Sequence, residues 1–357
     1  MAKKSFIEWE NEYIARINLY TRKVQQLYLL AVREAVKIGV SISDYDDKQP
    51  FTFDAYPQTK SRIAKVIDRL YKEMVVTIEE ATKNEWLEAC KKNDELVDFV
   101  ASSTRLTKAQ IVKYYGRNLD TLAAFQKRKY NGLNLSDRIW RYTDQFRQEI
   151  EMGLDIGLGE GRSADELSRD LRKYLQEPEK LFRRIRDKEN RERFYLSRNA
   201  AAYHPGAGMY RSSYKNALRM TRTEVNMAYR SSDYERWQNL DFVVGFEVRR
   251  SNNVFDCPVC NALKGKYPKT FKFVGWHPQC RCMVIPILAT QKEFVGYQKE
   301  LLISDQAPQL SSRNTISALP RGFRKWVFDN RNRTAKAISL PYFIRDNKAV
   351  LDGNGIG

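Results

Sequence analysis

The chain has 357 residues, of which 42% are hydrophobic and 30% are charged, a composition typical of folded rather than disordered proteins. Its 62 lysines and arginines exceed its 44 aspartates and glutamates, and the formal net charge of +18 predicts a polyanionic partner, most commonly nucleic acid. No stretch reaches the roughly 18 consecutive apolar residues of a membrane-spanning helix. The N-terminal residues lack the apolar segment of a signal peptide, so we expect a cytoplasmic protein without a membrane partner.

The first half of the chain is predicted to be helical. Apolar residues recur at steps of three and four between Ser5 and Gly39, which places them on one face of a helix. Residues 44–57 contain two prolines and are expected to form a loop. A second apolar stripe predicts a helix that continues toward Cys90, whose thiol we expect in the core. Both stripes are typical of a helical bundle core, and they consist of Tyr13, Ile17, Tyr20, Val24, Leu27 and Ala31, then Ile63, Ile67, Leu70, Met74 and Ile78.

Three further helices are expected from their N-terminal caps. One follows Thr107, a second is capped by Ser136 and ends in the glycine-rich region 153–161, and a third begins at the capping box of Ser163 and Glu166. The glycine-rich region lacks both the preceding strand and the lysine of a phosphate-binding loop. We therefore interpret it as a turn that ends a helix.

Residues 177–198 are dense in charge of both signs. This pattern is typical of a solvated helix or arm, with an arm that contacts DNA or a protein partner as the alternative. The loop predicted at 203–208 contains His204, which we expect to be a surface residue rather than a metal ligand.

After a helix over residues 210–237, the period of the apolar residues changes to two. The alternation over 242–249 predicts a half-buried strand, and a second strand is expected at 283–288, where Pro286 indicates an edge position. The predicted fold class is α+β and predominantly α-helical, with long N-terminal helices followed by a small α+β domain. The expected segments are a helical region at 1–130, the α+β domain at 131–290 and a basic, aromatic C-terminal tail at 291–357.

The C-terminal segment combines one predicted helix, over residues 292–303, with a stretch in which basic and aromatic residues alternate. Such a stretch suits phosphate contacts together with stacking on bases, and packing against a neighbouring subunit explains it equally well. The candidate nucleic-acid contacts are Arg321, Arg324, Lys325, Trp326, Arg331 and Arg333.

Four of the five cysteines cluster with a histidine, in the order Cys257, Cys260, His277, Cys280 and Cys282. A C-x-x-C turn presents two thiolates to one ion, and a second pair of ligands completes a tetrahedron, for which zinc is the default metal. Five candidates compete for four places. Cys280 and Cys282 are expected to point to opposite faces of an extended segment, so only one of them would bind the ion. The first possible ligand set is therefore Cys257, Cys260 and His277 with either Cys280 or Cys282. The other set takes the four cysteines without the histidine.

Reduced thiols and disulfides are the alternatives to zinc at this cluster. A catalytic zinc would keep an open position beside a base, and Asp256 is the nearest acid before the motif. Since the cluster can fill the coordination shell by itself, a structural zinc is predicted.

The ordered motifs between Ala217 and Pro286 carry a resemblance. An R-T-E sequence at Arg222–Glu224 is followed by the C-x-x-C turn, by L-x-G-K at Leu263–Lys266, and by H-P-x-C-R-C at His277–Cys282. This order resembles the Mu F-like phage head-morphogenesis family, the minor head proteins of tailed bacteriophages. The resemblance covers about 70 residues strongly, and a weaker likeness reaches back to 157–175.

The resemblance implies a virion protein inside the head near the portal vertex, made in the host cytoplasm, that acts in head assembly and in DNA packaging or delivery without catalysis. Its implied partners are the portal protein, the packaged double-stranded DNA and other head or scaffolding proteins. Within the motif we expect a structural charge network of Arg222, Glu224 and Arg281. The competing interpretations are a zinc-stabilised DNA-binding protein and a nuclease of the HNH kind, which the presence of only two histidines disfavours.

Overall fold

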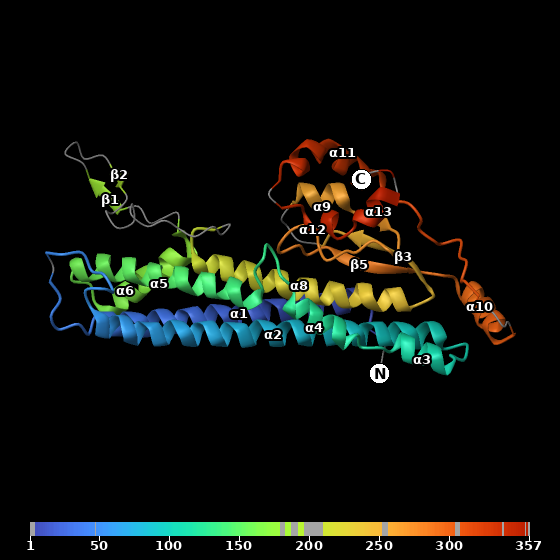
Figure 1. The fold of residues 1–357 in the computed structure, drawn as a ribbon, viewed down its shortest axis with the longest axis horizontal. Coiled ribbons are helices and arrows are strands. Elements are labelled where there is room, and N and C mark those ends of the chain that lie inside the picture. The colour runs from blue at the N-terminus through green and yellow to red at the C-terminus, as the bar shows by residue number, and fades with distance from the viewer. Residues whose placement is uncertain are drawn as a thin grey trace. The chain divides into compact units, whose positions relative to one another are not determined.

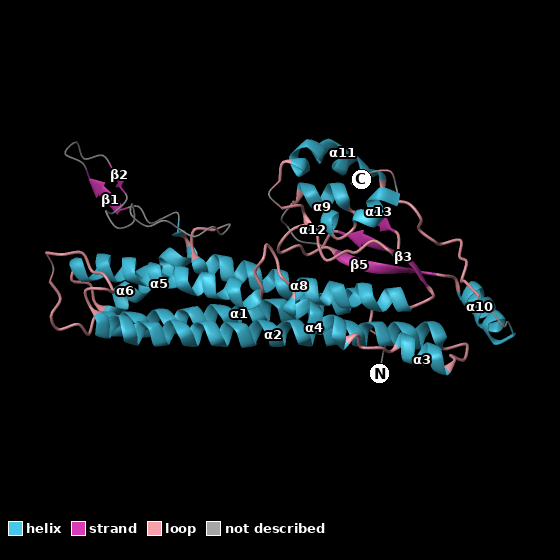
Figure 2. Ribbon diagram, viewed as in Figure 1, coloured by secondary structure: helices cyan, strands magenta, loops and turns pink. Residues whose placement is uncertain are grey.

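The computed structural model describes residues 4–46, 48–178, 183–186, 192–195, 210–251, 256–303, 308–337, 339–353 and 355. Helices dominate, and one three-stranded antiparallel sheet is present among the described residues, which confirms the predicted α+β, predominantly helical class (Figures 1 and 2). No helix in the described ranges combines the length and the apolar character needed to cross a bilayer.

Helices make up most of the described residues between Phe6 and Asn239, and the first two are long, as the apolar stripes predict. The loop expected at 44–57 separates the first two of them. The helices are α1 (Phe6–Gly39), α2 (Pro57–Ala101), α3 (Lys108–Tyr114), α4 (Leu119–Lys127), α5 (Leu135–Gly159), α6 (Ala164–Gln176) and α8 (Ser213–Asn239).

The described strands fall into two sheets. The first is the antiparallel pair β1 (Arg183–Arg186) and β2 (Glu192–Tyr195), and the second has the order β4-β3-β5. The strands of the second sheet and the C-terminal helices are β3 (Val243–Arg249), α9 (Pro258–Leu263), β4 (Gly265–Tyr267), β5 (Met283–Leu288), α10 (Gln291–Ile303), α11 (Arg321–Ala335), α12 (Tyr342–Arg345) and α13 (Lys348–Gly353).

The chain divides into two compact units that do not follow its order. The sheet unit comprises residues 1–17, 80–126 and 223–357, and the bundle unit comprises 18–79 and 127–222. This division differs from the expected consecutive segments 1–130, 131–290 and 291–357. The reason is physical: apolar periodicity reports which face of a helix is buried, and it does not report which distant segment covers that face.

The bundle unit has a continuous apolar core that runs through its helices. Tyr28 is fully buried, with its ring edge-on to Phe146 at 5.0 Å and to Tyr214 at 5.6 Å between ring centroids. The Glu149 carboxylate, also fully buried, accepts hydrogen bonds from the backbone N–H (2.8 Å) and the hydroxyl (2.5 Å) of Ser213. This carboxylate therefore binds one of the free N–H groups at the start of α8, that of Ser213.

The sheet unit is built around β3, the middle strand. Four consecutive residues of β3, Val243–Phe246, are buried, which contradicts the half-buried alternation expected from the sequence. A central strand covered on both faces reads as a continuous apolar run. Figure 1 shows α8 on one side of this sheet and α9 with α11 on the other. Pro286 lies in β5, an edge strand, as predicted.

The structure shows which residues cap the N-termini of α3, α5 and α6. Thr107 caps a helix and Ser163 forms a capping box with Glu166, as predicted, and the Thr107 cap is also a complete capping box, with Gln110. Ser136 does not cap α5, because the Asn134 side chain accepts the hydrogen bond from the Asp137 N–H instead. Asn and Ser are similarly good N-caps, so composition alone could not choose between them.

Two expected segments also differ from the sequence-based interpretation. The described part of 177–198 contains β1 and β2 where a solvated helix or arm was expected, and residues 203–208 with His204 lie outside the described residues. The C-terminal tail contains three further helices after α10, and Phe323 and Phe343 from these helices are buried in the sheet unit. Short helices with few polar caps leave weak sequence signals.

Candidate metal centre

The C-x-x-C turn is the first turn of helix α9. Cys257 is the N-cap residue and Pro258 occupies the first helical position, where a missing N–H costs nothing. The Asn261 N–H donates to the Cys257 carbonyl (3.0 Å), and the Lys264 N–H donates to the Cys260 carbonyl (3.1 Å). Residues three apart lie on one face of a helix, so both sulfur atoms are presented on the same side.

The second half of the centre is a turn that leads into β5. Gln279 has a positive φ of 63° and Gly275 has a φ of 120°, and the Cys280 N–H donates to the His277 carbonyl (3.0 Å). A φ near 120° is open to glycine and strained for other residues. This turn directs His277 back toward α9.

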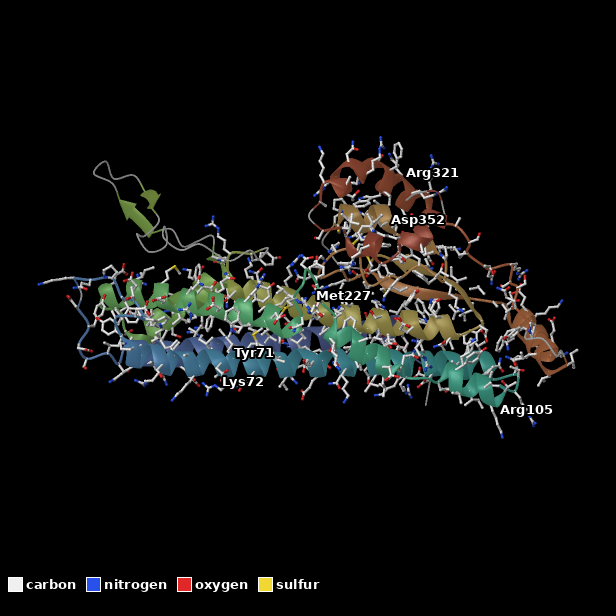
Figure 3. All side chains as sticks on the ribbon, viewed as in Figure 1. Tyr71, Lys72, Arg105, Met227, Arg321 and Asp352 are labelled. Carbon is white, nitrogen blue, oxygen red and sulfur yellow. The ribbon has the colours of Figure 1, made fainter. Side chains whose placement is uncertain are left out.

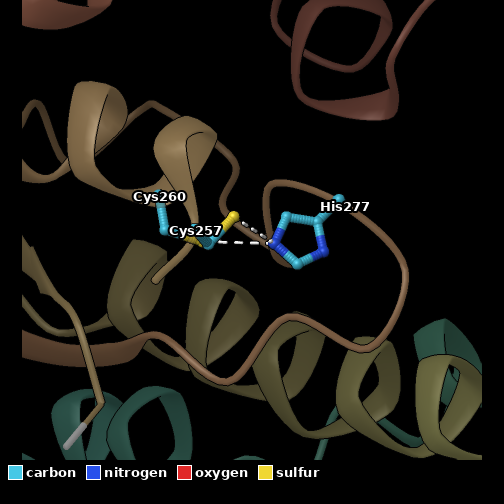
Figure 4. A group of neighbouring side chains, drawn as sticks. All are labelled: Cys257, Cys260 and His277. Atoms are coloured by element: carbon cyan, nitrogen blue, oxygen red, sulfur yellow. Dashed lines mark hydrogen bonds between the residues drawn. The ribbon is translucent and has the colours of Figure 1, made fainter. Parts of the chain in front are cut away.

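The His277 ring points at the two sulfur atoms of α9 (Figure 4). Its Nε2 lies 3.3 Å from the Cys257 Sγ and 3.2 Å from the Cys260 Sγ, and the Cys260 Sγ lies 3.9 Å from the Cys280 Sγ. In a tetrahedral zinc site with the usual bond lengths, ligand atoms are separated by roughly 3.5–3.8 Å. The observed spacings are close to the edges of such a tetrahedron.

The orientation of the imidazole suits a metal ligand. His277 Nδ1 lies 2.8 Å from the Pro278 carbonyl oxygen, which can only accept a hydrogen bond. A proton on Nδ1 leaves the lone pair on Nε2, the atom that faces the sulfurs. Metal-binding histidines are commonly held by a hydrogen bond of this kind from the other ring nitrogen.

Both Cys280 and Cys282 belong to the cluster. The sulfur atoms of Cys260, Cys280 and Cys282 lie within 4.8 Å of one another, and Cys260 also belongs to the group formed with Cys257 and His277. The expectation that Cys280 and Cys282 point to opposite faces is therefore wrong. They follow the turn at Gln279 and precede the first residue of β5, so the alternation of an extended strand does not apply.

The buried sulfur atoms strongly perturb one another. Hydrogen bonds from Cys260 and then Cys282 hold the pKa of the Cys280 thiol well below its usual range. The same hydrogen bond to Cys280 is the main cause that raises the pKa of Cys260. Because ionisation of one sulfur opposes ionisation of its neighbours, a divalent cation at this place would favour the thiolate form of all three.

Five donor atoms therefore converge, and together they could hold a metal ion. Cys260, Cys280 and Cys282 are 4–5% exposed, so only Cys257 and His277 are partly open to solvent. Cys90 is fully buried on α2, with its sulfur 3.5 Å from the Ser232 hydroxyl, which confirms it as a core thiol.

A small cavity of about 60 Å³ adjoins the cluster. Its lining residues are Arg250, Ser251, Cys257, Cys260, His277, Gln279, Arg281 and Cys282. The nearest acid, Asp256, is engaged elsewhere, since its carboxylate accepts hydrogen bonds from Arg250 (2.8 Å) and Asn261 (2.6 Å). The space is large enough for a water molecule or two.

Helix α8 fixes the backbone of the centre from below the turn. The Asn226 amide donates to the Val274 carbonyl (2.8 Å), the Thr223 hydroxyl accepts from the Gln279 N–H (3.2 Å), and the Arg230 guanidinium donates to the Cys282 carbonyl (3.1 Å). Positions 223, 226 and 230 share one face of the helix. That spacing is present in the sequence, but the three residues are polar, so the apolar periodicity did not reveal it.

The charge network of Arg222, Glu224 and Arg281 stays a prediction, and the structure shows how exposed each of the three side chains is. Glu224 is buried and Arg222 is half-buried on α8, whereas Arg281 is exposed and lines the cavity. The buried arginine that reaches the Cys/His segment is Arg230, 1% exposed. The candidate nucleic-acid contacts at 321–333 lie apart from the cluster, on α11.

Comparison of the chain with known protein families, with curated proteins and with solved structures found no match.

Proposed function

We propose that the Cys/His cluster is a structural zinc site and that the chain is a non-catalytic minor head protein of a tailed phage. In this role it lies inside the head near the portal vertex, binds the portal protein, and acts in head assembly and in DNA packaging or delivery. Before assembly it is located in the host cytoplasm. The net charge of +18 is consistent with a site beside packaged double-stranded DNA.

One observation carries the proposal. Motif elements that are far apart in sequence meet at one place in the sheet unit: Thr223 and Asn226, from the R-T-E helix, hold the turn that bears His277. That turn in turn faces the C-x-x-C residues of α9. The ordered motif set on which the resemblance rests thus corresponds to one spatial unit.

Zinc is the ion that the donor set favours. Thiolate and imidazole donors in a roughly tetrahedral arrangement select zinc over magnesium or calcium, which prefer oxygen ligands. Cys257, Cys260 and His277 supply three positions, and Cys280 or Cys282 supplies the fourth. When bound, the ion would cross-link α9 to the turn that leads into β5.

A structural role is favoured over nuclease chemistry because the nearby histidine and carboxylate already have partners within the protein. His277 directs its free nitrogen at the sulfurs, and Asp256 is bonded to Arg250 and Asn261. Metal-assisted phosphate chemistry needs an open coordination position and a base beside it. Five protein donors for four places leave no position that needs water.

The test is co-expression with the portal protein of the same phage, followed by size exclusion and metal analysis of each peak. We expect co-elution at a fixed ratio and about one zinc per chain. The double variant Cys257→Ser/Cys260→Ser leaves three of the five donors and should abolish zinc binding. Cys90→Ser is the matched control, because this buried thiol lies outside the cluster, and it should keep the zinc.

Three results would count against the proposal in different ways. Separate elution of the chain and the portal protein would reject the minor head role. Zinc content that is unchanged in the double variant Cys257→Ser/Cys260→Ser would reject the metal centre. Metal-dependent cutting of added DNA by the purified chain would favour the nuclease instead.

A further inference from the structure

Helix α11 has two faces of opposite character. Phe323 and Val327 are buried, and Phe323 lies edge-on to Phe271 (5.3 Å) and to Tyr267 (5.7 Å) in the aromatic core of the sheet unit. The opposite face is exposed and basic. Its residues are Arg321, Arg324, Lys325, Phe328, Arg331 and Lys336, with Arg333 at its margin. In Figure 3 the side chains of α11, among them the labelled Arg321, project outward from this helix.

The charge on this helix is strongly one-sided. From Arg321 to Lys336 the chain has six basic residues and one acidic residue, Asp329. The Asp329 carboxylate pairs with the Lys325 ammonium at 2.9 Å, an exposed pair of small energetic worth. The surface therefore keeps a local excess of positive charge in a chain that is basic throughout.

An aromatic ring lies among these cations. Phe328 is 63% exposed, and the Arg331 guanidinium stacks 4.1 Å from its ring centroid. Trp326, the aromatic residue that the sequence favoured for stacking, instead packs against Phe343 (5.4 Å between centroids). The contact between Phe328 and Arg331 holds the guanidinium in one place, which lowers the entropy that it would lose on binding a phosphate.

Helix α11 is packed closely against α9 near the start of its basic face. A Cβ at Gly322 would overlap the carbonyl oxygen of Ala262, so α11 and α9 lie backbone to backbone at this point. Gly322 follows Arg321 and precedes the buried Phe323. Because the inner face is fixed in the core, the basic face is presented as a rigid row of charges about 15 Å long, from Arg321 to Arg331.

We propose that the exposed face of α11 binds the phosphate backbone of double-stranded DNA. The inference deepens the proposed function, and it rests on that function for the identity of the nucleic acid as packaged duplex. A duplex carries one phosphate charge per roughly 1.7 Å of its axis, so a row of this length can reach several phosphates at once. The guanidinium and ammonium groups make backbone contacts that do not depend on base sequence.

A membrane surface fits this helix less well. Amphipathic helices bind bilayers through a broad exposed apolar face that enters the acyl region. In α11 that face, Phe323 and Val327, is already buried in the protein, and Phe328 is the exposed large apolar residue of the helix. Charge is therefore what the surface offers, and it matches phosphate spaced along a polymer.

The test compares two matched variants of the full chain by fluorescence anisotropy with a labelled DNA duplex at several salt concentrations. The first replaces Arg321, Arg324, Lys325 and Arg331 by Gln. The control replaces four other exposed basic residues by Gln, namely Arg22, Lys65, Arg105 and Lys108, and so has the same net charge. We expect the first variant to lose roughly tenfold or more in affinity, with the slope of log K against log salt falling by about 0.9 per lost contact. The control should lose much less.

Three outcomes would overturn the inference. Equal losses in the two variants would mean that DNA responds to total charge rather than to α11. Unchanged DNA binding in the first variant would exclude this face. Loss of binding to phosphatidylserine vesicles without loss of DNA binding would assign the face to a membrane. Co-elution with the portal protein should be retained by the first variant, so a failure of the proposed function is distinguished from a failure of this inference.

Discussion

Arg230 and Glu10 form a doubly hydrogen-bonded ion pair although 220 positions separate them in the sequence. The Nη1–Oε1 distance is 2.7 Å, the Nη2–Oε2 distance is 2.5 Å, and both side chains are almost fully buried. Burial alone would lower the pKa of Arg230, but the Glu10 carboxylate raises it well above its usual range. The same guanidinium donates to the Cys282 carbonyl, so this pair connects α1 with the metal centre.

Arg230→Ala should be strongly destabilising, because it leaves the Glu10 carboxylate buried without its partner. We expect a loss of about 3–5 kcal/mol in the free energy of unfolding, measured by urea titration of the tryptophan fluorescence. Arg69→Ala, which breaks an exposed pair with Glu34, is the control and should cost about 1 kcal/mol or less. Similar losses in both variants would show that the buried pair contributes no more to the free energy of unfolding than an exposed pair does.

Gly322→Ala should destabilise the sheet unit, because the new Cβ meets the Ala262 carbonyl and the backbone of α9 must move. The expected loss is about 1–3 kcal/mol, as for other overpacked positions. Zinc affinity, measured by competition with a chromogenic chelator, should fall as well, since α9 carries Cys257 and Cys260.

Gly296→Ala is the matched control for this glycine. It lies within α10, and no described atom would lie within 4 Å of the added Cβ. Alanine in place of glycine in an open helix should stabilise by about 0.5–1 kcal/mol. If both variants lowered the zinc affinity equally, the close packing at Gly322 would not be what supports the metal centre.

Glu149→Ala should weaken the start of α8 in the bundle unit. The change removes the acceptor for the Ser213 N–H and hydroxyl and for the Gln145 amide (3.1 Å), all of them buried. Leaving such donors unsatisfied should cost about 1–3 kcal/mol, with faster hydrogen exchange at the Ser213 amide. Asp144→Ala removes a partly exposed partner of Arg147, and it should leave that exchange rate unchanged.

The stability of the attachment of α10 to the segment at Ser312 should vary with pH, because it involves the Glu293 carboxylate. Hydrogen bonds from the Ser312 hydroxyl (2.7 Å) and then from the Arg313 and Thr290 N–H groups lower its pKa from 4.5 to about 2. A carboxyl group with a lowered folded-state pKa stabilises the fold above about pH 4.5, and this contribution is lost as the pH falls toward 2. A carbon-13 NMR titration of the carboxyl group should report the midpoint near pH 2.

Glu293→Gln provides the comparison for this titration. The amide cannot ionise, so the link between α10 and the segment at Ser312 should no longer vary between pH 4.5 and 2. A midpoint near 4.5 in the unaltered chain would contradict the hydrogen-bonded arrangement.

The local signals in the sequence predicted most of the helical architecture. The stripe that begins at Tyr13 predicted α1 nearly to the residue, and the N-cap at Thr107 and the capping box at Ser163 were confirmed. These features depend on residues within one or two turns of each other. The grouping of the Cys/His residues followed from their spacing, because a C-x-x-C turn in a helix and a nearby turn are also local features.

The long-range relationships could not be predicted in the same way. Neither Glu10 nor Lys92 has a neighbour in sequence that reveals its partner, yet Glu10 pairs with Arg230 and Lys92 with Asp233 (2.7 Å). A lone charge on an apolar helix face indicates a buried partner without naming it. The packing of the partly buried Trp326 against Phe343 likewise depends on α12, which no sequence pattern predicted.

The discontinuous make-up of the two units has a consequence for synthesis on the ribosome. The bundle unit has all its residues once Arg222 has emerged, whereas the sheet unit needs its first residues, its middle stretch and the last part of the chain. Glu10 and Lys92 must therefore wait, hydrated and unpaired, until Arg230 and Asp233 have been made. Contacts between such distant segments form slowly because the loops between them must close first. The order of translation thus allows the bundle unit to begin folding before the sheet unit has all its residues.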